Sequence, residues 1–86
     1  MQWKITSSYA DWQDTTHKTH EAAVIRLFAI ASELRGRART EADFASCDNF
    51  RNEVGHIGDE RDARIGVRLS EINDGKTVIF SLSKTG

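Results

Sequence analysis

The chain has 86 residues, of which 38% are hydrophobic and 29% are charged, and its formal net charge is −1. A chain of this length and composition is expected to form one globular domain, residues 1–86, with a small core. The near-zero net charge excludes a strong overall field that would draw the protein onto nucleic acid. A single cysteine excludes an internal disulfide, and the sequence Met1–Thr6 lacks the basic-then-apolar pattern of a signal peptide. We therefore expect a cytoplasmic protein that does not enter a membrane.

The first predicted element is a strand over Gln2–Tyr9, because its residues alternate in the period of two that a half-buried sheet produces. Trp3 and Ile5 would face the core. The sequence Tyr9–Trp12 follows as a turn, which places Trp12 outside the alternation and favours an exposed indole.

The polar segment Gln13–Lys18 is harder to assign. It lacks apolar alternation, which favours a loop leading into the next element. Thr15 and Thr16 are β-branched and would favour a short additional strand instead. Both alternatives stay open at the level of sequence.

The longest apolar run predicts a helix over Glu21–Arg35. Thr19 is a suitable N-cap, and Gly36 could close the helix in the left-handed conformation. At 100° per residue one side of this helix is continuously apolar, which predicts packing on a sheet or a second helix. The residues on that side are Ala23, Val24, Leu27, Phe28, Ile30, Ala31 and Leu34. Ile25 points away from them, so it is simply exposed, part of a second packed surface, or a contact for a partner.

A second helix is predicted over Glu41–Val54, opened by a capping box of Thr40 and Asp43. Cys47 lies on the apolar side of this helix, which favours a small buried side chain over a nucleophile. The glycine-containing sequence Gly55–Gly58 would end the helix.

The C-terminal third predicts a β-hairpin. Ile65–Ser70 and Val78–Ser83 both alternate apolar and polar residues, and Asn73–Gly75 between them tolerates the positive φ angles of turns.

These elements define an α+β fold in the order β-α-α-β-β. Two helices would pack on one face of a small antiparallel sheet of three strands, or four if Gln13–Lys18 also pairs. We expect the C-terminal strand, Lys76–Lys84, to lie at an edge of the sheet, where it could pair with a second copy. The protein would then be a monomer or an edge-strand homodimer.

No catalytic, cofactor or metal motif is present in the sequence. His17 and His20 have helical ligand spacing, but only the fold could add Cys47 or His56 to them. We therefore expect no enzymatic activity, no cofactor and no metal.

Charge is unevenly distributed along the chain. Residues 21–40 carry four arginines and two glutamates, whereas residues 41–64 carry seven acids and three arginines. An acidic segment can face a basic partner, and tryptophan is common at interface hot spots. The residues that we expect at a protein interface are Trp12, Ile25, Asp48, Glu53, Asp59 and Glu60.

The sequence thus favours a small protein-binding or regulatory module of the kind that bacteria and phages encode in short genes. The alternative is a nucleic-acid-binding module, in which arginines contact phosphates. Those arginines would be Arg26, Arg35, Arg37 and Arg39.

Overall fold

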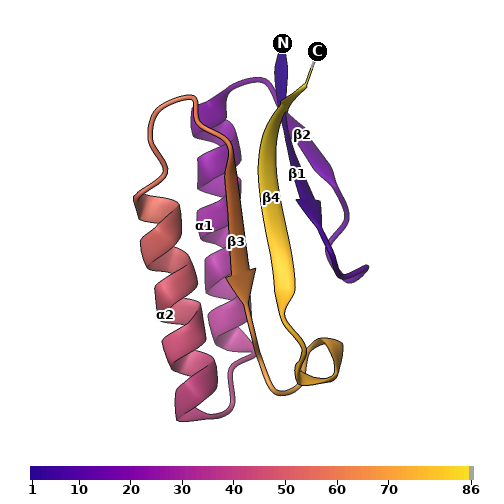
Figure 1. The fold of residues 1–86 in the computed structure, drawn as a ribbon, viewed down its shortest axis with the longest axis vertical. Coiled ribbons are helices and arrows are strands. Elements are labelled where there is room, and N and C mark those ends of the chain that lie inside the picture. The colour runs from indigo at the N-terminus through magenta and orange to yellow at the C-terminus, as the bar shows by residue number, and fades with distance from the viewer. Residues whose placement is uncertain (86) are drawn as a thin grey trace.

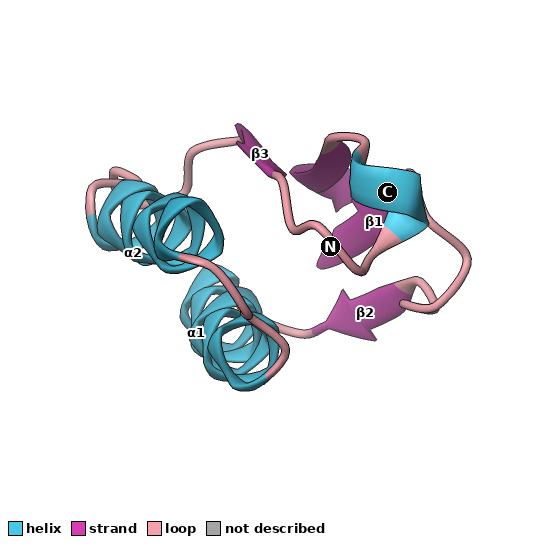
Figure 2. Cartoon of the chain, turned by 90° about the horizontal axis from the view of Figure 1, so that it is seen from below, coloured by secondary structure: helices cyan, strands magenta, loops and turns pink. Residues whose placement is uncertain are grey.

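The structure, a computed structural model, describes residues 1–85. Two helices lie side by side on one face of a four-stranded antiparallel sheet (Figures 1 and 2). The elements in chain order are β1 (Gln2–Ser7), β2 (Thr15–His17), α1 (His20–Gly36), α2 (Glu41–Gly55), β3 (Ala63–Val67), the short 3₁₀ turn η1 (Asn73–Gly75) and β4 (Val78–Thr85). The α+β class with both helices on one face is as predicted. The order is β-β-α-α-β-β.

The additional strand is β2, so the segment that lacked apolar alternation does pair. Thr15 lies opposite Ile5 and His17 lies opposite Trp3 in an antiparallel ladder. An edge strand of only three residues is held mainly by its backbone hydrogen bonds to the neighbouring strand, so it can form without an apolar face. The threonines also favour the extended conformation. The preference for a loop over Gln13–Lys18 was therefore wrong.

The prediction that the C-terminal strand lies at an edge is also wrong. The strand order is β2-β1-β4-β3, so β4 is central and pairs with β1 on one side and β3 on the other. Ile5 lies opposite Leu82, and Ile65 lies opposite Phe80, so the apolar sides of three strands face the helices together. The free edges are β2 and β3.

Both helix starts are as predicted. Thr19 caps α1 by accepting a bond from the Ala22 N–H, and Thr40 and Asp43 form the capping box of α2. Gly36 is not a left-handed cap. The helix continues through it, and Arg37, with φ of −101°, is the C-cap; its N–H donates to the carbonyl of Leu34, and the N–H of Ala38 donates to that of Arg35.

The β3–β4 hairpin is confirmed, but its connection is longer than a tight turn. Asn73, Asp74 and Gly75 all have positive φ angles, between 52° and 76°. Leu69 and Ile72 in this connection are buried and add to the core. Neither helix within residues 1–85 is long and apolar enough to cross a membrane.

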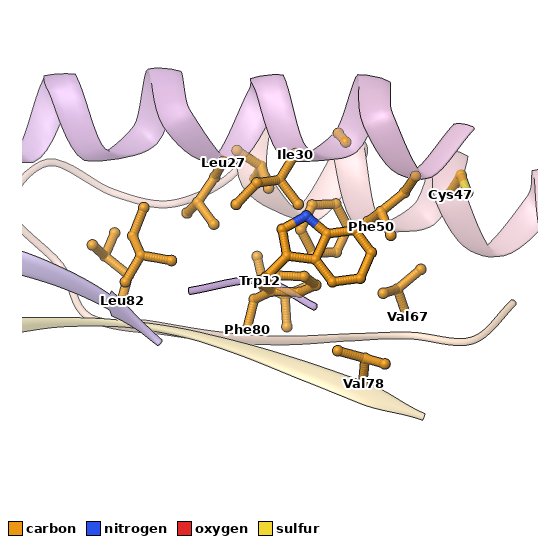
Figure 3. Close-up of a cluster of buried hydrophobic side chains, with 14 of the residues drawn as sticks. Trp12, Leu27, Ile30, Cys47, Phe50, Val67, Val78, Phe80 and Leu82 are labelled. Atoms are coloured by element: carbon orange, nitrogen blue, oxygen red, sulfur yellow. The ribbon is translucent and has the colours of Figure 1, made fainter. Parts of the chain in front are cut away.

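The core lies between the sheet and the two helices (Figure 3). Phe80 of β4 lies at its centre, with the ring of Phe50 from α2 packed edge-on at 5.4 Å and that of Trp12 at 5.6 Å. Cys47 is buried here as predicted, and burial raises the pKa of its thiol, so it is a packing residue.

Asp43 is a buried acid that does more than cap α2. Its carboxylate accepts bonds from the N–H of Arg39 at 3.0 Å, and from the N–H and hydroxyl of Ser70 at 3.0 and 2.8 Å. It therefore joins the start of α2 to the β3–β4 connection. The N–H of Arg39 is the largest cause that lowers the pKa of Asp43, from an ordinary 3.8 to about 2, although burial opposes the shift.

Because the folded pKa of Asp43 is depressed, its ionised form stabilises the fold above pH 3.8, and this contribution is lost as the pH falls towards 2. We expect Asp43→Asn to be less stable than wild type at pH 7 and to lose less stability between pH 4 and pH 2. Urea unfolding over this pH range measures both effects. Asp48→Asn, an exposed acid on the same helix, should keep the wild-type slope. An identical slope for Asp43→Asn would contradict the role of the carboxylate.

Candidate functional site

A groove lies where the first turns of α1 meet the segment that follows α2. The two helices are antiparallel neighbours, so the start of α1 lies beside the end of α2 (Figure 1). The hollow is open to solvent and has a volume of about 550 Å³. The residues that line it are Thr19, His20, Glu21, Val24, Ile25, Phe28, Ile57, Asp59 and Glu60.

The floor of this groove, the α1–α2 groove, is apolar. Ile25 is 61% exposed, and Val24, Phe28 and Ile57 each pack one side against the core. Arg51 of α2 places its guanidinium over the Phe28 ring, 5.6 Å from the ring centre. Ile25 is thus part of a continuous apolar patch, and isolated exposure is no longer the better interpretation of it.

The rim of the groove is acidic. Glu21, Asp59 and Glu60 are exposed, and within residues 1–85 none of them has a cationic nitrogen within 4.0 Å. The last turn of α2 carries no basic residue, so its negative dipole end adds to the same field. Carboxylates therefore border the apolar floor, and among residues 1–85 no lysine or arginine lines it.

His20 joins the two segments that form the groove. Its Nε2 lies 2.9 Å from the carbonyl oxygen of Arg61, and its ring packs edge-on against Trp3 at 4.7 Å. Because a carbonyl only accepts, Nε2 carries the proton of this bond. The segment after α2 is thereby held against the start of α1.

The structure brings together three of the six residues that were predicted for a protein interface, namely Ile25, Asp59 and Glu60. Asp48 lies at the other end of the helix pair, 3.5 Å from Arg35. Glu53 lines a separate shallow hollow beside β3.

Trp12, the sixth residue, was expected to be exposed, and this prediction is wrong. It is only 8% exposed because its indole packs against Phe80, and its Nε1–H donates to Glu33 at 3.1 Å. The guanidinium of Arg37 covers the ring at 5.2 Å. The connection between β1 and β2 places the indole between β4 and α1. This position depends on tertiary packing, so the local sequence could not predict it.

The predicted arginine cluster does not form one basic surface. Arg35, Arg37 and Arg39 lie 3.5, 3.7 and 3.2 Å from Asp48, Asp11 and Glu71, respectively. Each pair is exposed and contributes little to stability, but together they neutralise much of the local charge.

Arg26 lies apart from these three arginines. It precedes Arg35 by nine positions, and at about 100° per residue that spacing puts the two on opposite sides of α1.

Each of the three histidines has a hydrogen-bond partner of its own, and Cys47 is buried. His17 bonds to Thr15, His20 to the carbonyl of Arg61, and His56 to the carbonyl of Asn52. Within residues 1–85 no three potential metal-ligating side chains gather.

The free edge at β3 has α2 packed beside it. α2 packs against β3, whereas α1 packs against β1 and β2 (Figure 2). Neighbouring strands lie about 4.8 Å apart, but helices pack about 8–10 Å apart. Two β3 strands paired side by side would crowd their α2 helices, so the edge suits a bare peptide better than a second copy.

Sequence reasoning missed Glu21, Val24, Phe28 and Ile57 as groove residues. Val24 and Phe28 lie at the border of the apolar stripe of α1, and the stripe was assigned wholly to the core. The one sequence feature that could have indicated an exposed apolar patch was the position of Ile25 next to this border. Comparison with known protein families, with curated proteins and with solved structures gives no match, so the assignment of function rests on these residues.

We expect Trp12→Ala to lower the free energy of unfolding by about 3–5 kcal/mol, because it removes a large buried ring. That loss is comparable with the whole stability of a small domain. Chemical unfolding followed by circular dichroism measures it. Gln13→Ala, an exposed neighbour, should leave the unfolding midpoint unchanged. A Trp12→Ala protein as stable as wild type would contradict the burial of Trp12.

Proposed function

We propose that the chain is a small, non-catalytic protein-binding module and that the α1–α2 groove is its binding surface. The observation that carries the proposal is the exposure of Ile25 within a patch shared with Val24, Phe28 and Ile57. Exposed apolar patches bordered by polar residues mark interaction surfaces in soluble proteins.

The shape of the groove supports a macromolecular partner. Sites for small molecules enclose most of their ligand in a concave pocket. This groove is open to solvent, and Ile25 lies 61% exposed within it. Such a surface suits contact with a side chain or helix of another protein.

The charges favour a protein over nucleic acid as the partner. The rim carries three carboxylates, and the arginines at the opposite end lie against acids. Phosphate backbones bind to uncompensated cations, which these surfaces lack. The proposal includes a cytoplasmic location, since the single cysteine is kept as a buried free thiol.

We expect Ile25→Ser to abolish capture of the partner, because it removes the most exposed apolar side chain of the groove, while stability changes by less than about 0.5 kcal/mol. The measurement is affinity purification of the tagged chain from the cells that produce it, with and without nuclease. The purification is repeated at two salt concentrations.

Phe44→Ser is the matched control, because it removes another exposed apolar side chain at the far end of the helix pair. It should retain the partner. Loss of the partner in both variants, or recovery of nucleic acid alone that moderate salt removes, would contradict the proposal. The second result would favour the arginines instead.

A further inference from the structure

We infer that the α1–α2 groove binds a basic segment of its partner, one that inserts an apolar side chain and carries lysine or arginine within a few residues of it. This inference rests on the proposed function and adds the chemical class of the ligand. The apolar floor and the acidic rim each impose one of the two requirements.

The balance of charge around the groove favours a cation. Glu21 comes from α1, and Asp59 and Glu60 come from the segment after α2, while no lysine or arginine in the described part of the chain lines the hollow. The guanidinium of Arg51 lies over the Phe28 ring, 5.6 Å from its centre, and not among the carboxylates. The side chain of Arg61 folds back over Gly58.

The two helix ends at the groove act differently. The positive end of α1 is offset by Glu21 in its first turn and by the Thr19 cap. The negative end of α2 receives a hydrogen bond from His56, whose Nδ1 donates to the carbonyl of Asn52, but its last turn contains no basic residue. A lysine or arginine of the partner would supply the cation that is missing at this end.

Glu60 occupies a backbone conformation that suits glycine better. Its φ angle is 55°, in the left-handed region that side chains with a Cβ adopt uncommonly. Uncommon backbone conformations concentrate at binding sites. A carboxylate at this position can be removed without harm to the fold, because glycine accepts the same angle.

A second copy of the chain is the main competing occupant. Phe44 is 38% exposed, and the guanidinium of Arg35 lies 5.3 Å from its ring centre, so a copy does present an apolar side chain beside a cation. Arg35 is already paired with Asp48, however, and offers little free charge. A head-to-tail contact of this kind would also extend into filaments unless it closed into a ring. A different protein is therefore the better match.

The test uses random peptides displayed on phage, selected against the full chain at low ionic strength. Affinities of the selected peptides are then measured by calorimetry on wild type, Glu60→Gly and Ile25→Ser. Glu41→Gln is the matched control, because it removes an exposed carboxylate at the far end of α2.

We expect selected peptides to combine lysine or arginine with an aliphatic or aromatic residue. Glu60→Gly should weaken their binding about two- to fivefold, as expected for loss of one exposed ion pair, without lowering the melting temperature. Ile25→Ser should abolish binding, Glu41→Gln should leave it unchanged, and added salt should weaken it.

The outcomes separate the two claims. Peptides that need Ile25 but show no enrichment in lysine or arginine, or that ignore Glu60→Gly, overturn the inference and leave the proposed function standing. A selection that yields no peptide dependent on Ile25 overturns both. Self-association in sedimentation that both Ile25→Ser and Phe44→Ser remove assigns the groove to a second copy and overturns the inference.

Discussion

The packing of aromatic rings around Phe80 is the contact on which the rest of the structure depends. Phe80 lies on the central strand, Phe50 reaches it from α2, and Trp12 reaches it from the connection between β1 and β2. Edge-on aromatic pairs contribute about 0.5–1.5 kcal/mol beyond their buried area. In a chain of 86 residues, where total stability is small, these contacts set how the helix layer sits on the sheet. The position of the helices on the sheet in turn determines the shape of the groove at the start of α1.

The two ends of the helix pair differ in how their charges are satisfied. At the end where α1 meets α2 through a short connection, Arg35 and Arg37 lie against carboxylates, and Asp43 accepts bonds from two segments of the chain. At the opposite end, none of the groove carboxylates within residues 1–85 has a cationic nitrogen within 4.0 Å. The charged side chains at the first end are paired within the molecule, whereas the carboxylates at the groove end are exposed to solvent or to a partner. This asymmetry is the physical basis for the inference that the partner segment is basic.

Local structure could be predicted from the sequence because it depends on neighbouring residues. Short-range rules account for the Thr19 and Thr40 caps, the apolar side of α1 and the positive φ angles at Asn73–Gly75.

Strand order could not be predicted, because the pairing of β1 with β4 joins the two ends of the chain. The burial of Trp12 depends on that pairing, and so does the central place of β4. The bonds that Ser70 donates to the Asp43 carboxylate span 27 positions and could not be predicted for the same reason. The groove was half predicted: Ile25, Asp59 and Glu60 were identified, but their proximity depends on the antiparallel packing of α1 and α2.

The central claim is that the surface around Ile25 contacts another protein, and site-specific photo-crosslinking tests it most directly. A benzoylphenylalanine placed at Ile25, and in a separate protein at Phe44, is irradiated in the cells that produce the chain, and the attached peptides are identified by mass spectrometry. The account predicts an adduct from position 25 to a lysine- or arginine-containing segment of one protein, and no such adduct from position 44. No adduct from position 25, or the same set of adducts from both positions, would contradict it.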